Sequence, residues 1–258
     1  MKNSVVVFTD LDGSLLDHQS YEYTAAKPAL ERLERAEIPV IPVTSKTLEE
    51  ISLLQLPFPQ PYRIAENGMV IEHEGAVQIQ GRSYDTITGF INDLPQNIRN
   101  NITGFGDMSV DDVIRHTGLD RTQAQAAKAR KATEPFLWSG DEQGIEGLRV
   151  LAAQQQLYIT QGGRFYHLMG KGNKQTALKH VLDAGFSGSQ PVTIALGDGP
   201  NDAEMLGFVD YGVIIPNPAG TSFNVKDPHG KIMTASHAGP EGWNAALHTI
   251  LDELELSV

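Results

Sequence analysis

The chain has 258 residues, no cysteine and a formal net charge of −12 at pH 7. The missing thiols exclude disulfides, thiolate catalysis and cysteine-based metal sites, and the negative charge argues against nucleic acid or anionic membranes as partners. No stretch approaches the roughly 18 apolar residues of a membrane span, and the few residues before Asp10 do not fit a signal peptide. We therefore expect a cytoplasmic protein, and the sequence contains no signal for an oligomeric state.

The first 70 residues alternate between apolar runs and amphipathic runs. The expected elements are strands at 4–9, 38–44 and 62–68, and helices at 25–36 and 47–56. Such alternation predicts a parallel sheet covered by helices. Ligands of such sheets bind at the carboxyl ends of the strands. Asp10, Thr44 and Glu66 all lie at such ends.

The middle of the chain predicts an α+β pattern instead. Residues 69–79 indicate a hairpin that turns at Glu74-Gly75, and Gly162-Gly163 is a second hairpin signal. Between and around these signals we expect helices at 86–99, 109–117, 120–131 and 141–155, and strands at 102–106, 134–138, 157–161 and 164–169.

The parallel rhythm returns after residue 171. The expected elements are a helix at 174–184, a strand at 191–198, a helix that starts near Pro200, a strand at 211–217 and a helix at 241–254. We therefore predict an α/β core made of residues 1–83 and 170–258, interrupted by an inserted α+β domain of residues 84–169. Insertion of a domain at a surface loop is well tolerated.

Two carboxylates follow the first strand, in the segment "VVVFTDLDGSLLD". Asp10 and Asp12 are two apart, so on an extended chain they point the same way. A calcium loop is excluded, because Gly13 falls at the wrong position and Tyr21 stands where the pattern needs Glu. A solvated Asp-Gly turn remains open, as does a nucleophile beside a general acid/base at a divalent cation.

The segment "LGDGPNDAEML" (196–206) favours the catalytic interpretation, because it repeats the arrangement of a strand, an acid and a glycine. Asp198 ends the strand and Asp202 follows four residues later. Acids from two strand ends at one edge of a parallel sheet form a hard-oxygen site suited to Mg²⁺ and a substrate phosphate.

Donors for a phosphate are present in "VTSKT" (43–47), where a helix begins after the second strand. The backbone N–H groups of a helix start bind anions, although the hydroxyls could equally cap that helix. Lys171 and Lys174 stand near the start of a later helix, where the helix dipole disfavours a cation. Together these groups describe phosphoryl transfer to a carboxylate, assisted by proton transfer, a lysine and a metal.

These motifs resemble those of the haloacid dehalogenase superfamily, in its Cof-like branch with a type-2B cap. The matching segments are "DLDGS", the strand-end Thr44, the lysine of "NKQTAL", and "GDGPND". The resemblance implies a Rossmann-like α/β core with a parallel sheet and an inserted α+β cap that selects the substrate. It also implies Mg²⁺ as the cofactor and the following roles: Asp10 as the nucleophile, Asp12 as the general acid/base, Thr44, Lys174 and Asn201 at the phosphate, and Asp10, Asp12 through its backbone carbonyl, Asp198 and Asp202 at the metal.

One departure from the Cof-like pattern narrows the resemblance to a single family within the superfamily. "VTSKT" stands where Cof-like members usually carry Thr-Gly-Arg, and with "GRFYHLMGKGNKQTAL" and "GPEGW" it is similar to the mannosyl-3-phosphoglycerate phosphatase family. That family implies a small anionic substrate, mannosyl- or glucosyl-3-phosphoglycerate, and a product that is a compatible solute. Lys46, Arg164 and His167 are the candidates for further substrate contacts. The alternatives are a broader sugar-phosphate phosphatase, a phosphomutase on the same scaffold, and a non-catalytic sugar-phosphate sensor.

Overall fold

The computed structural model describes residues 4–162, 164–218 and 222–255. A five-stranded sheet forms the centre of the α/β part, in the order β12-β11-β10-β1-β2, and all its neighbouring strands are parallel. Its strands are β1 (Val5–Thr9), β2 (Val40–Pro42), β10 (Val192–Gly197), β11 (Tyr211–Ile214) and β12 (Lys231–Thr234). The parallel sheet predicted from the sequence is confirmed, whereas the edge strand β12, short and partly exposed, was not expected.

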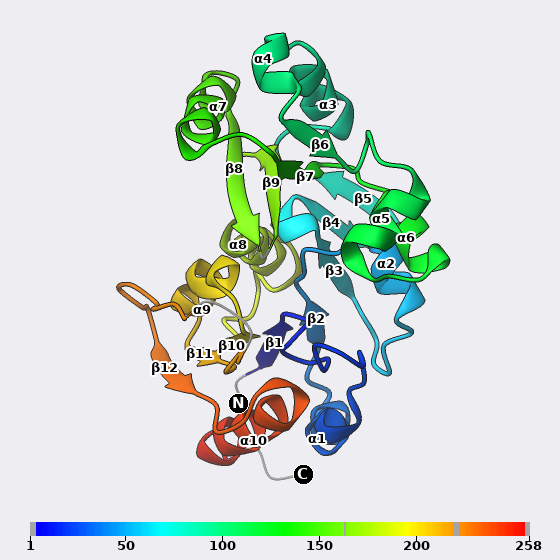
Figure 1. Ribbon diagram of the computed structural model, residues 1–258. Coiled ribbons are helices and arrows are strands. Elements are labelled where there is room, and N and C mark those ends of the chain that lie inside the picture. Colours follow the sequence, from blue (N-terminus) through cyan, green and yellow to red (C-terminus); the bar gives the residue numbers. More distant parts are fainter. Residues whose placement is uncertain (1–3, 163, 219–221, 256–258) are drawn as a thin grey trace.

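Helices cover both faces of this sheet (Figure 1). Val5 and Val7 of β1 face a cluster with α1 (Lys27–Arg35) and α10 (Gly239–Glu253), next to the short helix η1 (Thr24–Ala26). Val6 and Phe8 face the opposite cluster, formed with α8 (Lys174–Gly185) and α9 (Ala203–Phe208). A strand buried on both faces needs a continuous apolar run, which explains the four apolar residues before Thr9.

A small antiparallel sheet adjoins β2, with the order β3-β4-β5. Its strands are β3 (Tyr62–Ala65), β4 (Val70–His73) and β5 (Ala76–Ile79). The expected hairpin turns at Glu74 and Gly75, where φ is 51° and 81°. The expected strand 62–68 ends early, because residues 66–68 form a turn, η2 (Glu66–Gly68), and only a single bridge, Val43 to Ile64, joins β3 to β2.

The segment between residues 84 and 170 contributes a separate four-stranded antiparallel sheet, in green at the top of Figure 1. In spatial order its strands are β6 (Ile102–Gly104), β7 (Thr133–Trp138), β9 (Phe165–Gly170) and β8 (Leu157–Gly162). One cluster packs α3 (Tyr84–Asn92) and α7 (Glu142–Gln154) on this sheet, and another gathers α5 (Val110–Thr117) and α6 (Arg121–Ala127). The strands around the predicted Gly162-Gly163 turn do pair, although Gly163 itself lies outside the described residues.

Several of the expected helices are shorter than the sequence pattern indicates, among them those at 47–56, 86–99 and 120–131. The run 86–99 is divided, and α4 (Gln96–Arg99) begins after Pro95, which cannot continue a preceding helix. Helix α6 ends at Ala127 rather than at residue 131, and residues 131–133 bond to the side chain of Glu66. None of the helices in the described ranges has both the length and the apolar character that crossing a membrane requires.

Candidate active site

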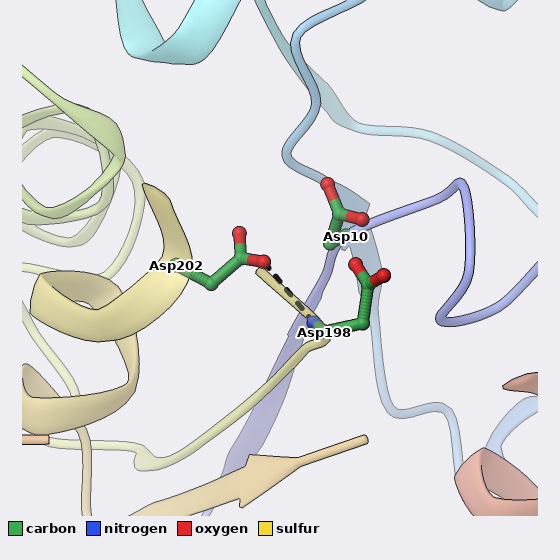
Figure 2. A group of neighbouring side chains, drawn as sticks. All are labelled: Asp10, Asp198 and Asp202. Carbon is green, nitrogen blue, oxygen red and sulfur yellow. Dashed lines mark hydrogen bonds between the residues drawn. The ribbon is translucent and has the colours of Figure 1, made fainter. Parts of the chain in front are cut away.

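Three carboxylates meet where β1 and β10 end (Figure 2). The pairing of β1 with β10 places Asp10 beside Asp198, since the Asp10 N–H donates to the Leu196 carbonyl at 2.9 Å. Asp202 arrives from η3 (Pro200–Asp202), and one oxygen of each carboxylate lies within 4.8 Å of the other two. The structure therefore brings together three of the four acids that the sequence predicted for a metal.

A single buried ammonium group lies inside this acidic cluster. The Lys174 Nζ is 2.5 Å from Asp10 Oδ1 and 2.6 Å from Asp202 Oδ1, and only 1% of its side chain is exposed. Burial alone would lower the pKa of Lys174, but the two neighbouring carboxylates raise it above its ordinary value. These ion pairs offset the unfavourable interaction of a cation with the dipole at the start of α8. Lys171, the other lysine near the start of this helix, is exposed.

The cluster carries an excess of negative charge in a poorly solvated place. Burial raises the pKa of Asp10 well above its ordinary value, and Asp202 and Asp198 raise it further, while Lys174 opposes them. Burial, and then the charge of Asp202, likewise raises the pKa of Asp198. Three carboxylates against one ammonium leave two negative charges uncompensated, so the fully ionised cluster favours a divalent cation.

Asp12 faces a different partner from the cluster. Its Oδ2 forms an ion pair with the Lys46 Nζ at 2.8 Å, and its Oδ1 is buried without a hydrogen-bond partner among the described residues. The Asp12 carboxylate is thus outside the three-acid group, and the predicted role of its backbone carbonyl stays a prediction. The chain turns at Gly13, where φ is 79° and a Cβ atom would lie 2.4 Å from Asp198 Oδ2, so a glycine is needed there.

The hydroxyls after β2 divide between two tasks. Thr47 is the N-cap of α2 (Leu48–Leu53), because its side chain accepts from the Glu50 N–H while Glu50 accepts from the Thr47 N–H. Thr44 is therefore not needed as the helix cap, and it lies buried directly after β2 with its Oγ1 accepting from the Lys46 N–H at 3.2 Å. The sequence left capping and phosphate binding open, and the structure assigns the capping to Thr47.

A family model described as haloacid dehalogenase-like hydrolase matches residues 7–221. The chain belongs to this family of hydrolases. A "Glucosyl-3-phosphoglycerate/mannosyl-3-phosphoglycerate phosphatase" of Persephonella marina is 37% identical over 97% of this chain and 98% of its own length. A relative with the same name in Methanococcoides burtonii is 36% identical over 95% of this chain and 97% of its own length.

The fold of this haloacid dehalogenase-like hydrolase is shared with solved structures. A phosphatase of the haloalkanoate (HAD) enzyme superfamily from Bacteroides thetaiotaomicron superposes with a TM-score of 0.72. The two chains are 18% identical, and the match covers 99% of this chain and 97% of the other. The predicted fold class and the predicted superfamily are both confirmed.

Two asparagines adjoin the acidic cluster of the hydrolase. Asn201, a predicted phosphate ligand, is exposed, and its Nδ2 donates to Asn67 Oδ1 at 3.3 Å. Asn217 was not predicted, and its Nδ2 donates to Asp198 Oδ2 at 2.6 Å. Its place just after β11, the next strand of the parallel sheet, is the signal that could have identified it.

The two candidates in the inserted segment lie apart from each other. Strand β9 begins at Phe165, so Arg164 precedes it, and the exposed guanidinium donates to the His116 carbonyl at the end of α5. The structure therefore does not bring Arg164 together with the other candidates. The predicted contact of Arg164 with a substrate stays a prediction.

His167 lies on β9 of the four-stranded sheet, on the face that is turned toward the α/β core. This face also carries Thr133 and Met169, since their register places all three side chains on one side. Thr133 bonds to Glu66 of the core, and Met169 belongs to the core cluster. The His167 Nδ1 is buried and has no partner among the described residues, so the ring offers an unused polar atom on that face.

Resistance to acid should depend on His167. Burial, together with the positive charge of Arg130, lowers the pKa of the His167 imidazole to about 3. The pKa of a histidine in an unfolded chain is about 6.5. As the pH falls below about 6.5, the unfolded chain takes up a proton that the folded chain excludes, so stability falls by up to about 1.4 kcal/mol per pH unit. In urea unfolding between pH 6.5 and 4.5 we expect a shallower loss of stability for His167→Asn. The exposed control His18→Asn should keep the wild-type slope, and an unchanged slope in His167→Asn would contradict a neutral buried ring.

Proposed function

We propose that this hydrolase removes the phosphate from glucosyl-3-phosphoglycerate, mannosyl-3-phosphoglycerate or both, with Mg²⁺ as the cofactor. The products would be glucosylglycerate or mannosylglycerate. The observation that carries the proposal is the three-acid cluster around Lys174 at the strand ends. The names of the two relatives, 37% and 36% identical over nearly the whole chain, support the choice of substrate.

In the proposed reaction, Asp10 and Asp12 act in two steps. An oxygen of Asp10 attacks phosphorus, the bond from phosphorus to the glycerate oxygen breaks, and Asp12 gives its proton to that leaving oxygen. Asp12 then takes a proton from a water molecule, whose oxygen attacks phosphorus and releases phosphate from the Asp10 carboxylate. In the substrate-free structure Asp12 is paired with Lys46 as a carboxylate, which is the form that the second step needs. The first step needs a protonated Asp12, so Lys46 would have to turn from Asp12 to the anionic substrate when the substrate binds.

The donor set fits Mg²⁺, a hard cation that prefers oxygen ligands and keeps several waters. Asp10, Asp198 and the backbone carbonyl of Asp12 would hold the ion directly. Asp202 would support its water shell, because its Oδ1 already accepts from Lys174 and its Oδ2 from the backbone N–H groups of Asp198 and Gly199. When bound, the ion would neutralise charge on the phosphoryl group.

The phosphate would be bound by Thr44, Lys174 and Asn201, and the rest of the substrate by the inserted segment. We propose that residues 84–169 form a cap domain on a core of residues 1–83 and 170–258. The hydrogen bonds of residues 131–133 to Glu66 and of Arg130 to the Ser45 carbonyl support this division, since they seat the segment beside the strand ends. Lys46 and His167 are the proposed contacts for the glycerate and sugar groups. A cytoplasmic location stays a prediction.

Phosphate release from a panel of substrates tests the proposed function. The panel contains both glycosyl-3-phosphoglycerates, 3-phosphoglycerate, hexose phosphates and p-nitrophenyl phosphate, each assayed with Mg²⁺ and with EDTA. We expect kcat/KM for at least one glycosyl-3-phosphoglycerate to exceed the others by about 10²-fold or more, because specific polar contacts discriminate strongly, and EDTA to abolish turnover.

Two results of the panel would point elsewhere. Similar kcat/KM values for all sugar phosphates would favour the broader sugar-phosphate phosphatase. Phosphate transfer that depends on a bisphosphate activator, with no net release of phosphate, would favour the phosphomutase.

A further inference from the structure

The turn after β3 has a backbone conformation that L-residues rarely adopt. Glu66, Asn67 and Gly68 follow one another with φ values of 52°, 58° and 93°. Left-handed conformations are disfavoured for residues with a Cβ atom, and they persist where the surrounding structure holds them. Glu66 and Asn67 carry a Cβ atom and still adopt this disfavoured conformation, so contacts around the turn must hold it in place.

On one side the turn is attached to the elements that position the catalytic groups. The Asn67 N–H donates to the Thr44 carbonyl at 2.9 Å, and the Asn67 side chain accepts from Asn201. Gly68 packs directly against the start of α8, since a Cβ atom there would lie 2.3 Å from the Asn173 carbonyl oxygen, next to Lys174. The turn therefore contacts the phosphate-binding strand end, the loop of the acids and the helix of the buried lysine.

On the other side the Glu66 side chain reaches the inserted segment. Its carboxylate is fully buried, and Oε1 accepts from the Lys131 N–H at 2.8 Å. Oε2 accepts from the Ala132 N–H at 3.1 Å and from the Thr133 hydroxyl at 2.8 Å. In the described part of the chain no lysine, arginine or histidine forms an ion pair with it. Among the described residues, the Glu66 carboxylate therefore accepts hydrogen bonds from three donors, and all three belong to residues 131–133.

The segment bound by Glu66 leads directly into the sheet of the inserted domain. Thr133 is the first residue of β7, and β7 pairs with β9, the strand that carries His167. Moving residues 131–133 would therefore move the sheet face that is turned toward the core. Arg130 also crosses this boundary, to the Ser45 carbonyl and to Glu50, but it precedes the segment that leads into β7. The Lys131–Glu49 ion pair is a weaker contact, because its side chains are 32% and 41% exposed.

We propose that Glu66 is a positioning residue for the reaction, which holds the inserted domain in register with the catalytic strand ends. The inference rests on the proposed function for its substrate, but its structural part does not. A substrate whose sugar and glycerate groups contact the inserted domain depends on this register. A small aryl phosphate, which needs only the groups at the strand ends, depends on it much less.

The isosteric variant Glu66→Gln tests the proposal. Its amide turns one acceptor oxygen into a donor, which must then face either the Lys131 N–H or the pair formed by Ala132 and Thr133. We expect kcat/KM for the preferred glycosyl-3-phosphoglycerate to fall about 10- to 100-fold, as for the loss of a buried charged hydrogen bond. Turnover of p-nitrophenyl phosphate should fall much less, and the amides of Lys131 and Ala132 should exchange hydrogen faster in the substrate-free protein.

Two further variants complete the experiment. Glu49→Gln makes the same chemical change at the exposed partner of Lys131, and it should leave both activities and both amides unchanged. Thr133→Val removes one of the three donors with little change of shape, so it gives a smaller effect of the same kind and serves if Glu66→Gln does not fold.

If Glu66→Gln lowers the activity toward the glycosyl-3-phosphoglycerate and toward p-nitrophenyl phosphate by the same factor, the proposal is overturned. Unchanged hydrogen exchange at the amides of Lys131 and Ala132 would also overturn it. Should the wild-type enzyme not hydrolyse glycosyl-3-phosphoglycerates, the proposed function fails. The exchange measurement still decides whether Glu66 holds the inserted domain.

Discussion

Asp10→Asn should lower kcat for phosphate release by at least about 10⁴-fold, as losses of a nucleophile do in enzymes that form covalent intermediates. The amide oxygen is uncharged and a poor nucleophile toward phosphorus. The variant also replaces one of the three carboxylates of the acidic cluster with a neutral amide, which weakens the proposed Mg²⁺ site. The measurement is phosphate release at saturating substrate and Mg²⁺, with the melting temperature recorded in parallel.

The fold of this variant should survive, since Lys174 keeps its ion pair with Asp202 and the repulsion among the acids is reduced. Asp183→Asn is the matched control, because Asp183 is exposed on α8 and forms an ion pair with Lys179 on the same helix, away from the acidic cluster. It should turn over like the wild type. Turnover of Asp10→Asn within about tenfold of the control would exclude attack by Asp10 on phosphorus.

Lys174→Met should abolish most of the activity and also destabilise the metal-free protein. The variant removes the one cation that forms ion pairs with Asp10 and Asp202 among the described residues, and breaking a buried ion pair costs about 3–5 kcal/mol. With the ammonium absent, the attraction that opposes burial at Asp10 is lost, so the pKa of Asp10, already raised in the folded state, rises further above its unfolded value. The loss of stability is therefore small at low pH and grows as the pH rises through neutrality.

Urea unfolding at pH 5.5 and pH 8, with and without Mg²⁺, measures this effect. Mg²⁺ should stabilise Lys174→Met more than it stabilises the wild type, because a ligand of the folded state adds stability and the variant has more charge to neutralise. Lys179→Met on the same helix is the control, since its ion pair is exposed and contributes little. Wild-type stability of Lys174→Met at pH 8 without Mg²⁺ would contradict a structural role for the buried pairs.

The local pattern of the sequence was enough for the parallel core and for the acids at its edge. Apolar runs such as Val5–Thr9 are long enough to be recognised, and an acid directly after a strand lies at a known edge of the sheet. Strand pairing then leaves little freedom, so Asp10 and Asp198 meet as predicted. The local pattern indicated Lys171 and Lys174 alike, and the family resemblance favoured Lys174. The structure buries Lys174 against Asp10, whereas Lys171 is exposed.

Contacts between segments far apart in the chain were decided only by the tertiary structure. Nothing near Glu66 in the sequence indicates that it binds residues 131–133, because two of the three donors are backbone N–H groups that almost any sequence possesses. The same holds for the ion pair of Asp12 with Lys46 and for the bond from Asn217 to Asp198.

The two kinds of information therefore answer different questions about this protein. Its family and the acids at its strand ends follow from short-range patterns, because hydrophobic periodicity and strand ends are local properties. The attachment of residues 130–133 to Ser45 and Glu66 depends on single buried polar groups, and their partners become defined only when the chain has folded.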